Sequence, residues 1–507
     1  MNTFEGLLYG LSVATQPTVL FYCFVGVFLG TFIGVLPGVG ALAAISLLLP
    51  VTYYIQPEAA LVMLAGVYYG AQYGGSIAAI LLRLPGTPQS AVTAIEGYPL
   101  ARQGRAGLAL FSAMSGSFIG SMLGILILVL FAPLLAKIGT KFGAAEYASM
   151  MLLGLVAAST VGATSPAKSM AMVVVGMILG CIGTDVNSGA MRFTFGQTAL
   201  LDGVNLVALA MGLFGISEVI SNIRGSDERK LREKVGLREM LKERRELRRI
   251  IFPAIRGTGL GAFFGALPGT GGVIATFISY ATERKVTRTP ERFGNGAVEG
   301  VAGPEAANNS GAITAFIPTL TLGIPGDVVM ALMLGAMIIH GIQPGPLMLV
   351  ERPEMFWGLI ASFGIGNLFL LVLNLPLIGI WVALLRIPFS LLYPAIVVFV
   401  CIGVYSVRGS TFDVYSVVVI GAAGYALSLM KFNPALLLLG FVLGPLIETN
   451  LRRALLLSRG DLLVFFERPI SAGFMAAIIA LILWGLFTSI RSRRGGSAPA
   501  SVTESGD

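Results

Sequence analysis

The sequence predicts an all-α polytopic membrane protein with roughly 11–14 transmembrane helices, in two repeat-related halves that contain Pro/Gly-broken or re-entrant segments. Three observations predict this fold. Of the 507 residues, 55% are hydrophobic and 12% are charged, and the mean hydropathy is +0.85. Apolar runs of about 20 residues, the length that crosses a bilayer, recur along the chain. A segment of the first half also recurs in the second. This composition excludes a soluble enzyme, a disordered protein and a nucleic-acid-binding domain.

Apolar runs define the predicted helices. In chain order they are 17–36, 41–55, 60–82, 107–136, 146–163, 167–184, 200–221, 250–267, 271–282, 296–322, 327–350, 356–385, 390–406, 411–430, 433–449 and 470–490. Segments 41–55 and 271–282 are too short to cross a core of about 30 Å, so we expect half-helices or re-entrant segments there. Prolines inside the runs, at 37, 85, 268 and 325, also indicate broken helices.

The charge pattern predicts orientation and domain organisation. The formal net charge is +8, and residues 222–256 alone contain 12 Lys/Arg against 6 Asp/Glu. Because positive charge stays on the cytoplasmic side, we place this segment and the C-terminal arginines there. The predicted organisation is a first transmembrane repeat half (1–221), a charged cytoplasmic loop (222–249), a second repeat half (250–490) and a disordered C-terminal tail (491–507).

An internal repeat is the most informative feature of the sequence. Residues 26–40, GVFLGTFIGVLPGVG, match residues 257–271, GTGLGAFFGALPGTG, at nine of fifteen positions with a constant offset of 231. In each copy, glycines spaced by four lie on one helix face and permit close approach of another helix. Each copy ends in Leu-Pro-Gly, where proline ends the helix and glycine exposes backbone amides and carbonyls.

A second pair of breaks follows the first pair. Leu84-Pro-Gly-Thr87 resembles Ile324-Pro-Gly-Asp327 at an offset of 240. Matching interrupted segments in two halves are typical of the substrate site of a secondary transporter. Helix packing alone remains an alternative explanation for the glycine ladder. The glycines are not a phosphate-binding loop, because no Gly-Lys-Ser/Thr follows them.

Polar residues in the first half cluster near its second break. Gln72 and Ser76 interrupt an apolar helix, and Thr87 follows the break, where it is a natural N-cap if Pro88 starts a helix. Amides at such a start favour an anionic group, so a carboxylate substrate fits there. Arg83 precedes the break. It could attract an anion or mark the cytoplasmic edge of the membrane.

The second half has its own polar cluster at the start of an apolar helix. Glu305, Asn308 and Asn309 offer carboxylate and amide oxygens, which suit Na⁺ coordination or proton exchange rather than a soft metal. Asp327 directly follows the second break. A wet loop around Glu305, with the asparagines and Asp327 as caps, is the alternative.

The sequence predicts no enzyme and no cofactor beyond Na⁺ or H⁺ as coupling ion. One histidine, His340, cannot build a multi-histidine metal site, and the three cysteines show no zinc or disulfide spacing. We find no hydrolase, kinase or metalloprotease constellation.

At these motifs the chain resembles the large permease subunit of the tripartite tricarboxylate transporters, the TctA family. The resemblance covers roughly residues 15–485, and one departure is Glu96, where Asp is more usual. The motifs that carry it are Gly34–Gly40, Tyr73–Ser76, Leu84–Pro88, Gly97–Pro99, Gly265–Gly271, Pro304–Asn309 and Leu322–Gly326.

The resemblance implies a secondary active transporter that imports a di- or tricarboxylate across the bacterial inner membrane, driven by a Na⁺ or H⁺ gradient. It implies two partners, a small membrane subunit (TctB-like) and a periplasmic solute-binding protein (TctC-like). No nucleic-acid partner is expected. A carboxylate channel without ion coupling is the alternative.

The expected sites follow from the breaks and the polar clusters, and we expect the halves to be inverted repeats that meet at the site. The predicted coupling-ion residues are Glu305, Asn308, Asn309 and Asp327. The predicted substrate-binding residues are Pro37, Gly38, Gly40, Gln72, Ser76, Gly86, Thr87, Gly269, Thr270, Gly271 and Gly326.

Overall fold

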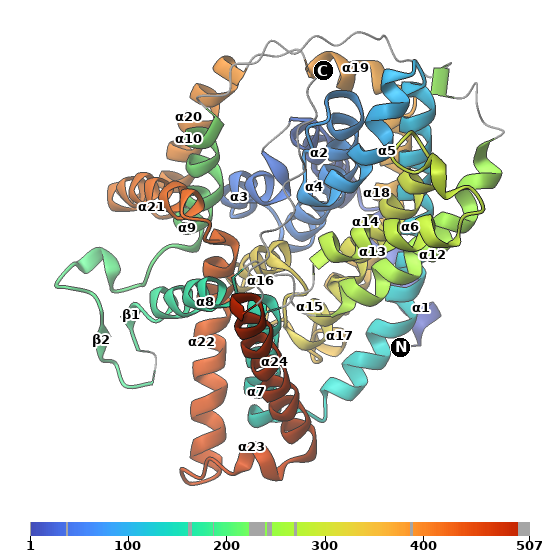
Figure 1. The fold of residues 1–507 in the computed structure, drawn as a ribbon. Coiled ribbons are helices and arrows are strands. Elements are labelled where there is room, and N and C mark those ends of the chain that lie inside the picture. Colours follow the sequence, from blue (N-terminus) through green and yellow to red (C-terminus); the bar gives the residue numbers. More distant parts are fainter. Residues whose placement is uncertain are drawn as a thin grey trace.

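The structure is a computed structural model, and it confirms the predicted all-α fold (Figure 1). Apart from one short hairpin, its regular elements are helices within the described part of the chain. The described residues are 2–36, 39–160, 165–185, 187–222, 239–240, 246–267, 271–385 and 389–494.

The first part of the chain runs from the N-terminus to the charged segment. Its elements are α1 (Thr3–Ala14), α2 (Pro17–Val35), α3 (Gly40–Thr52), α4 (Pro57–Leu82), the 3₁₀ turn η1 (Pro88–Ser90), α5 (Ala91–Arg102), α6 (Ala106–Gly139), α7 (Ala144–Thr160), α8 (Pro166–Gly180), β1 (Gly183–Thr184), β2 (Met191–Arg192), η2 (Thr198–Leu200), α9 (Leu206–Ala210), the π-helix η3 (Met211–Ile216) and α10 (Ser217–Asn222).

The second part follows the charged segment. Its elements are α12 (Leu247–Ala266), α13 (Gly271–Val286), η5 (Pro290–Arg292), α14 (Glu299–Thr314), α15 (Phe316–Leu322), α16 (Val328–Ile339), α17 (Met348–Glu351), α18 (Pro353–Asn374), α19 (Ile378–Leu384), α20 (Phe389–Arg408), α21 (Thr411–Leu429), α22 (Pro434–Leu457), α23 (Val464–Glu467) and α24 (Pro469–Arg494).

Helix length separates the spanning helices from the broken ones. Among the described residues, α2, α6, α18, α21 and α22 are long and apolar enough to cross a membrane, and seven shorter apolar helices accompany them. Helices α3 and α13, with 13 and 16 residues, are short as predicted. The number of crossings, the inversion of the repeats and the domain boundaries stay predictions. Most of 222–249 and all of 495–507 lie outside the described residues, and α24 continues past residue 490 to Arg494.

The glycine ladder of α2 lies against the backbone of α4. A Cβ on Gly26 would stand 2.2 Å from the carbonyl oxygen of Met63, and a Cβ on Gly30 would stand 2.4 Å from that of Val67. Real Cβ atoms do not approach backbone so closely. Only glycine therefore allows these two helices to pack at their observed separation.

The repeated ladder of α12 uses the same packing on α14. A Cβ on Gly257 would stand 2.1 Å from the carbonyl oxygen of Gly303, and one on Gly261 would stand 2.1 Å from that of Ala307. Gly303 and Ala307 lie 240 residues after Met63 and Val67, which is the offset of the second pair of breaks. The repeat therefore extends from the sequence motif to the helix pair.

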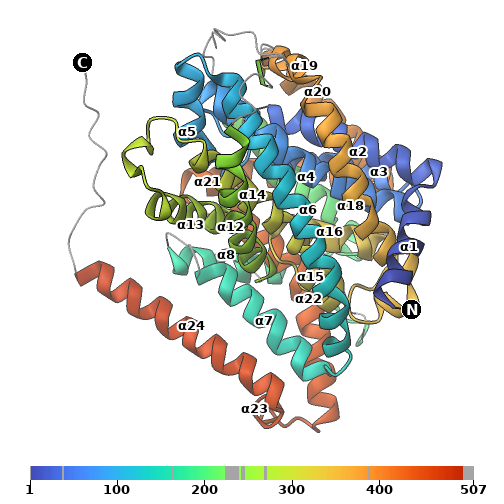
Figure 2. The ribbon, with the colours of Figure 1, turned by 90° about the vertical axis from the view of Figure 1, so that its right-hand side faces the viewer.

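A further ladder, which the sequence analysis did not single out, lies on α6. Gly116 and Gly120 pack against the carbonyl oxygens of Ala302 and Ala306 on α14, where added Cβ atoms would stand at 2.5 and 2.4 Å. Helix α14 is thus held between two glycine faces, those of α12 and α6 (Figure 2). The spacing of four was visible in the sequence, but its partner helix was not.

Glu96 on α5 joins the two parts of the chain. Its carboxylate accepts hydrogen bonds from the Tyr280 hydroxyl (2.7 Å) and from the backbone N–H groups of Gly294 (2.5 Å), Gly296 (2.8 Å) and Ala297 (2.8 Å). The residue is fully buried. Four donors therefore balance the cost of burying this carboxylate.

Replacing Glu96 by glutamine is expected to lower the free energy of unfolding by about 1–3 kcal/mol, because the new amide group cannot accept from donors on both sides. The measurement is the thermal midpoint of the purified protein in detergent. Glu291→Gln is the matched control, since Glu291 is exposed in the neighbouring turn. Equal midpoints for the two variants would contradict this role of Glu96.

Helices α7, α22, α23 and α24 project to one side of the bundle, at the bottom of Figures 1 and 2. The β1–β2 hairpin region is tied to α22 by an ion pair, in which Arg452 Nη1 lies 2.9 Å from Asp185 Oδ2. The backbone N–H of Asn187, the Ser188 hydroxyl and Arg452 lower the pKa of Asp185 to about 2. The loop carboxylate therefore stays charged at physiological pH.

Candidate functional site

A cavity of about 720 Å³ lies where the broken helices of the two parts of the chain meet. The start of α3 contributes Gly40, and the start of α13 contributes Gly272. The segment after α4 contributes Gly86 and Thr87, and the segment before α16 contributes Asp327. Four helix interruptions, two from each part of the sequence, therefore converge on one cavity.

Other elements close the cavity. Helix α4 contributes Gln72, α7 contributes Ala158, α8 contributes Ser169 and α10 contributes Glu218. The remaining lining comes from Val39, Ala41, Leu42, Ala43, Pro85, Pro88, Gln89, Phe214, Val273, Ile274, Pro325, Val328, Val329, Asn433, Ala435, Leu436 and Leu439. Its size is that of a small-molecule site, and its wall is mostly apolar.

The charged groups of the cavity wall are both acidic. Among the residues given above as lining it, Glu218 and Asp327 are charged and no lysine or arginine is present. An anion bound there meets backbone amides and polar side chains rather than a basic side chain. The starts of the helices at the wall supply the positive partial charges available to such an anion.

The two second breaks have the same local structure. Arg83 is the C-cap of α4, with φ 57°, and Gly323 is the C-cap of α15, with φ 69°. The backbone therefore turns through the left-handed region at both breaks. Asp327 then caps α16, because its Oδ1 accepts from the Met330 N–H at 2.8 Å. Its Oδ2 accepts from the buried Tyr68 hydroxyl at 2.5 Å. The alternative prediction that Asp327 is a cap is therefore confirmed.

Two amide side chains beside the cavity have unused polar atoms. Within the described residues, Gln72 Oε1 and both polar atoms of Asn308 are buried and have no hydrogen-bond partner. Gln72 lines the cavity, and Asn308 Oδ1 lies 3.7 Å from where a Cβ on Gly272 would stand. Buried polar atoms without partners are rare and costly, so at the edge of a cavity these two side chains are candidates to contact a ligand.

Glu305 lies deeper, among hydroxyl groups. Its carboxylate accepts from Ser76 Oγ at 2.7 Å, from Ser117 Oγ at 3.0 Å and from Thr93 Oγ1. These hydroxyls come from α4, α6 and α5, while Glu305 lies on α14 and is 1% exposed. No cationic side chain among the described residues pairs with it. A buried carboxylate with hydroxyl donors and no paired cation is a candidate to hold a proton or a cation.

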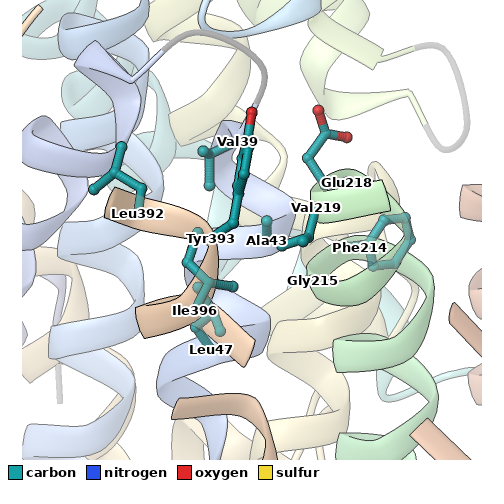
Figure 3. Close-up of a pocket in the computed structure, with 10 residues that line it drawn as sticks. All are labelled: Val39, Ala43, Leu47, Phe214, Gly215, Glu218, Val219, Leu392, Tyr393 and Ile396. Atoms are coloured by element: carbon teal, nitrogen blue, oxygen red, sulfur yellow. The ribbon is translucent and has the colours of Figure 1, made fainter. Parts of the chain in front are cut away.

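A narrow crevice of about 10 Å³ adjoins the cavity (Figure 3). Val39, Ala43, Phe214 and Glu218 line both spaces. In Figure 3 the carboxylate of Glu218 and the hydroxyl of Tyr393 point toward the same end of the crevice. Its remaining wall is apolar, so Glu218 provides the polar edge that joins the crevice to the cavity.

Comparison with known proteins agrees with this arrangement. Residues 20–439 match the Tripartite tricarboxylate transporter TctA family. The chain belongs to this family. A relative in Agrobacterium vitis, described as "Uncharacterized 52.8 kDa protein in TAR-I ttuC' 3'region", is 50% identical over 497 residues, 97% of this chain and 98% of its own. A second, "Uncharacterized protein in TAR-II ttuC' 3'region" of the same organism, is 53% identical over 234 residues, 46% of this chain and 97% of its own. No solved structure matches the chain.

Membership of the TctA family points to a membrane transport permease. Four of its predicted substrate-binding residues line the cavity, namely Gly40, Gln72, Gly86 and Thr87. Ser76 instead turns to Glu305, and Gly326 packs on Ala315 with its N–H 3.4 Å from Thr319 Oγ1. Gly271 is the first residue of α13, one position before the cavity wall. Pro37, Gly38, Gly269 and Thr270 lie outside the described residues.

The predicted ion residues of this TctA chain do not form one cluster. Glu305 faces the hydroxyls of α4, α5 and α6, and Asn308 lies next to Gly272. Asn309 donates from Nδ2 to Ser121 Oγ at 3.2 Å on α6. Asp327 lines the cavity as the N-cap of α16. Helical periodicity places Glu305 and Asn309 about 40° apart, so both face α6, and it turns Asn308 about 100° away from Asn309, toward α13.

Several cavity and cluster residues were not predicted as site residues. Glu218 is the single charged residue between Asp202 and Arg224, and an acid in an apolar run is a functional signal by default. Asn433 directly precedes Pro434, and in the sequence this pattern indicates only a helix N-cap. Thr93 and Ser117 carry no signal of their own, because their role depends on which helix faces them.

Proposed function

We propose that the protein imports a di- or tricarboxylate of the citrate kind across the bacterial inner membrane, driven by a Na⁺ or H⁺ gradient. The central cavity, bounded by both pairs of helix breaks, is the observation that supports this proposal. A transporter of this class needs a site that both halves of the chain contact, so that their relative movement opens it to either side.

The carboxylate is bound by backbone and amide groups. The starts of α3, α13 and α16 lie at the cavity wall and carry the positive ends of helix dipoles. Asn308 Nδ2 is a donor without a protein partner among the described residues, and Gln72 Oε1 and Asn308 Oδ1 are unpartnered acceptors that suit a cation or a hydroxyl group bound with the carboxylate. These groups recognise carboxylates without a fixed counter-charge, which allows release.

The coupling cation is bound by Glu305 and its hydroxyl groups. Carboxylate and hydroxyl oxygens are ligands for Na⁺, and the same carboxylate can carry a proton. Because the cavity wall is acidic, the substrate enters more readily when cations accompany it. Charge balance therefore couples the substrate to the ion.

The proposal includes partners and location. A periplasmic solute-binding protein of the TctC kind delivers the carboxylate, and a small membrane subunit of the TctB kind completes the permease. Membership of the TctA family supports the proposal of these two partners. The basic segment 222–256 then lies on the cytoplasmic side.

The test is uptake into proteoliposomes that contain this chain and its small subunit. Labelled citrate and a panel of di- and tricarboxylates are supplied with the binding protein under separate Na⁺ and pH gradients. Uphill uptake that requires the binding protein and one gradient is the expected result. Downhill flux without either would overturn the proposal and favour a channel.

Asn308→Leu separates binding from stability. Leucine removes two buried polar atoms without partners, each costing about 1–3 kcal/mol, so the thermal midpoint is expected to stay level or rise. The citrate concentration for half-maximal uptake is expected to rise at least about tenfold, because a substrate hydrogen bond is lost. Thermal midpoint and concentration-dependent uptake are measured on the same preparation.

Asn374→Leu is the control for this experiment. Asn374 is a buried asparagine on α18 whose Oδ1 also lacks a partner among the described residues, and it is not part of the cavity wall. Its uptake curve is expected to match that of the wild type. An Asn308→Leu variant with unchanged half-saturation would remove Asn308 from the binding site.

A further inference from the structure

A second cavity, of about 580 Å³, adjoins the central one through Pro85, which lines both. Its wall is formed by the chain that follows the first-half break and by Gly294 of the second part. The segment 85–91 therefore separates two cavities, each large enough for a small molecule.

The second cavity has the opposite charge to the first. Among the described residues, Arg83 and Arg102 are its charged lining residues and no carboxylate lines it. Neither guanidinium forms an ion pair within the described part of the chain, and Arg83 lies over the Tyr98 ring at 5.9 Å from its centroid. Two unpaired arginines at one concave surface attract an anion.

The backbone at Arg83 gives an independent reason for its presence. Arg83 has φ 57° in the left-handed region, whereas the matching position of the second half is Gly323, with φ 69°. Glycine adopts this conformation without strain, and an arginine does not. A strained residue at a position where the repeat uses glycine indicates that its side chain has a role.

The position of this cavity indicates which side of the membrane it opens to. Gly107, at the start of α6 just after Arg102, packs on Glu239 and Met240 of the charged segment, where an added Cβ would stand 2.7 Å from Glu239 C. Gln103 Nε2 also donates to the carbonyl oxygen of Asn295 at 2.9 Å. The arginines therefore lie at the end of the bundle that carries the basic segment.

We propose that Arg83 and Arg102 form an anion-binding vestibule at the cytoplasmic end of the permease, through which the carboxylate passes between the central cavity and the cytoplasm. This inference rests on the proposed function. The vestibule binds the released carboxylate in a basic site after it leaves an acidic cavity. Its attraction acts over about one Debye length and weakens with salt.

The experiment is citrate exchange in proteoliposomes that contain the complex, with the binding protein outside. Liposomes are loaded with unlabelled citrate at a series of concentrations, and labelled citrate enters from outside. In the Arg83→Gln/Arg102→Gln double variant, the internal citrate concentration for half-maximal exchange is expected to rise about tenfold. The external half-saturation is expected to stay within about twofold. High internal salt is expected to reduce the difference.

Two further variants test whether the effect of the double variant comes from a change in folding rather than from loss of the anion site. Arg459→Gln is the control, since Arg459 is an exposed arginine that also has positive φ (56°), and it is expected to behave as wild type. Arg83→Gly relieves the backbone strain, so its thermal midpoint is expected not to fall while its internal half-saturation rises.

The outcomes distinguish the two proposals. If the wild type takes up no carboxylate of the panel, the proposed function fails and the vestibule with it. If the wild type transports but the double variant has unchanged internal half-saturation, or equal changes on both sides, the vestibule alone is refuted. A difference that appears only in liposomes with anionic lipid would assign the arginines to lipid headgroups and also overturn the inference.

Discussion

Glu305→Gln is expected to abolish gradient-driven citrate accumulation while the protein remains folded. Glutamine keeps the size of the side chain, and because a serine hydroxyl can either donate or accept, Ser76 and Ser117 can pair with its oxygen and its NH2 group. Glutamine carries no charge, however, so it cannot hold a cation or exchange a proton. Removing the charged partner of a buried cation costs about 3 kcal/mol, which is about a hundredfold in affinity. Uptake is measured in proteoliposomes under Na⁺ and pH gradients, with citrate exchange measured in parallel.

Exchange without net accumulation is the expected pattern, because exchange does not require the ion site to empty. Glu299→Gln is the matched control on the same helix. Glu299 pairs with Arg249 at 2.9 Å, at the start of α14 and away from the hydroxyl cluster. Normal accumulation by Glu305→Gln, with its usual ion dependence, would show that the coupling ion binds elsewhere.

Gly261→Ala is expected to destabilise the protein by about 1–3 kcal/mol, although alanine favours helices over glycine by about 1 kcal/mol. The new methyl group would stand 2.1 Å from the carbonyl oxygen of Ala307 and 2.2 Å from Ser310 Oγ, so α12 has to move away from α14. Because α14 carries Glu305 and Asn308, the same change is expected to reduce uptake. Thermal midpoint and uptake rate are both measured.

Gly259→Ala on the same helix is the control, because within the described part of the chain no atom of another element lies within 4 Å of the Cβ it would add. Its midpoint is expected to stay level or rise by the helix-propensity gain. If Gly261→Ala were as stable as Gly259→Ala, close packing of α12 on α14 would not hold the site in place.

The repeat explains why part of the site was predictable. Leu-Pro-Gly motifs at matching positions required broken helices, and proline and glycine act locally, so Gly40, Gly86 and Thr87 were identified from sequence. The contacts of Glu96 and Glu218 could not be predicted from the sequence. The first accepts hydrogen bonds from a loop 198 residues away, and the second reaches the cavity from α10.

The sequence by itself determined the helical membrane fold, the breaks and the set of polar residues near them, because these depend on composition, periodicity and local backbone chemistry. Only the tertiary structure decided which of those polar groups meet. It directs Ser76 and Glu305 to a hydroxyl cluster and leaves the Asn308 side chain without a protein partner among the described residues. The physical reason is that the rotation of α14 between the glycine faces of α6 and α12 assigns each side chain to a neighbour.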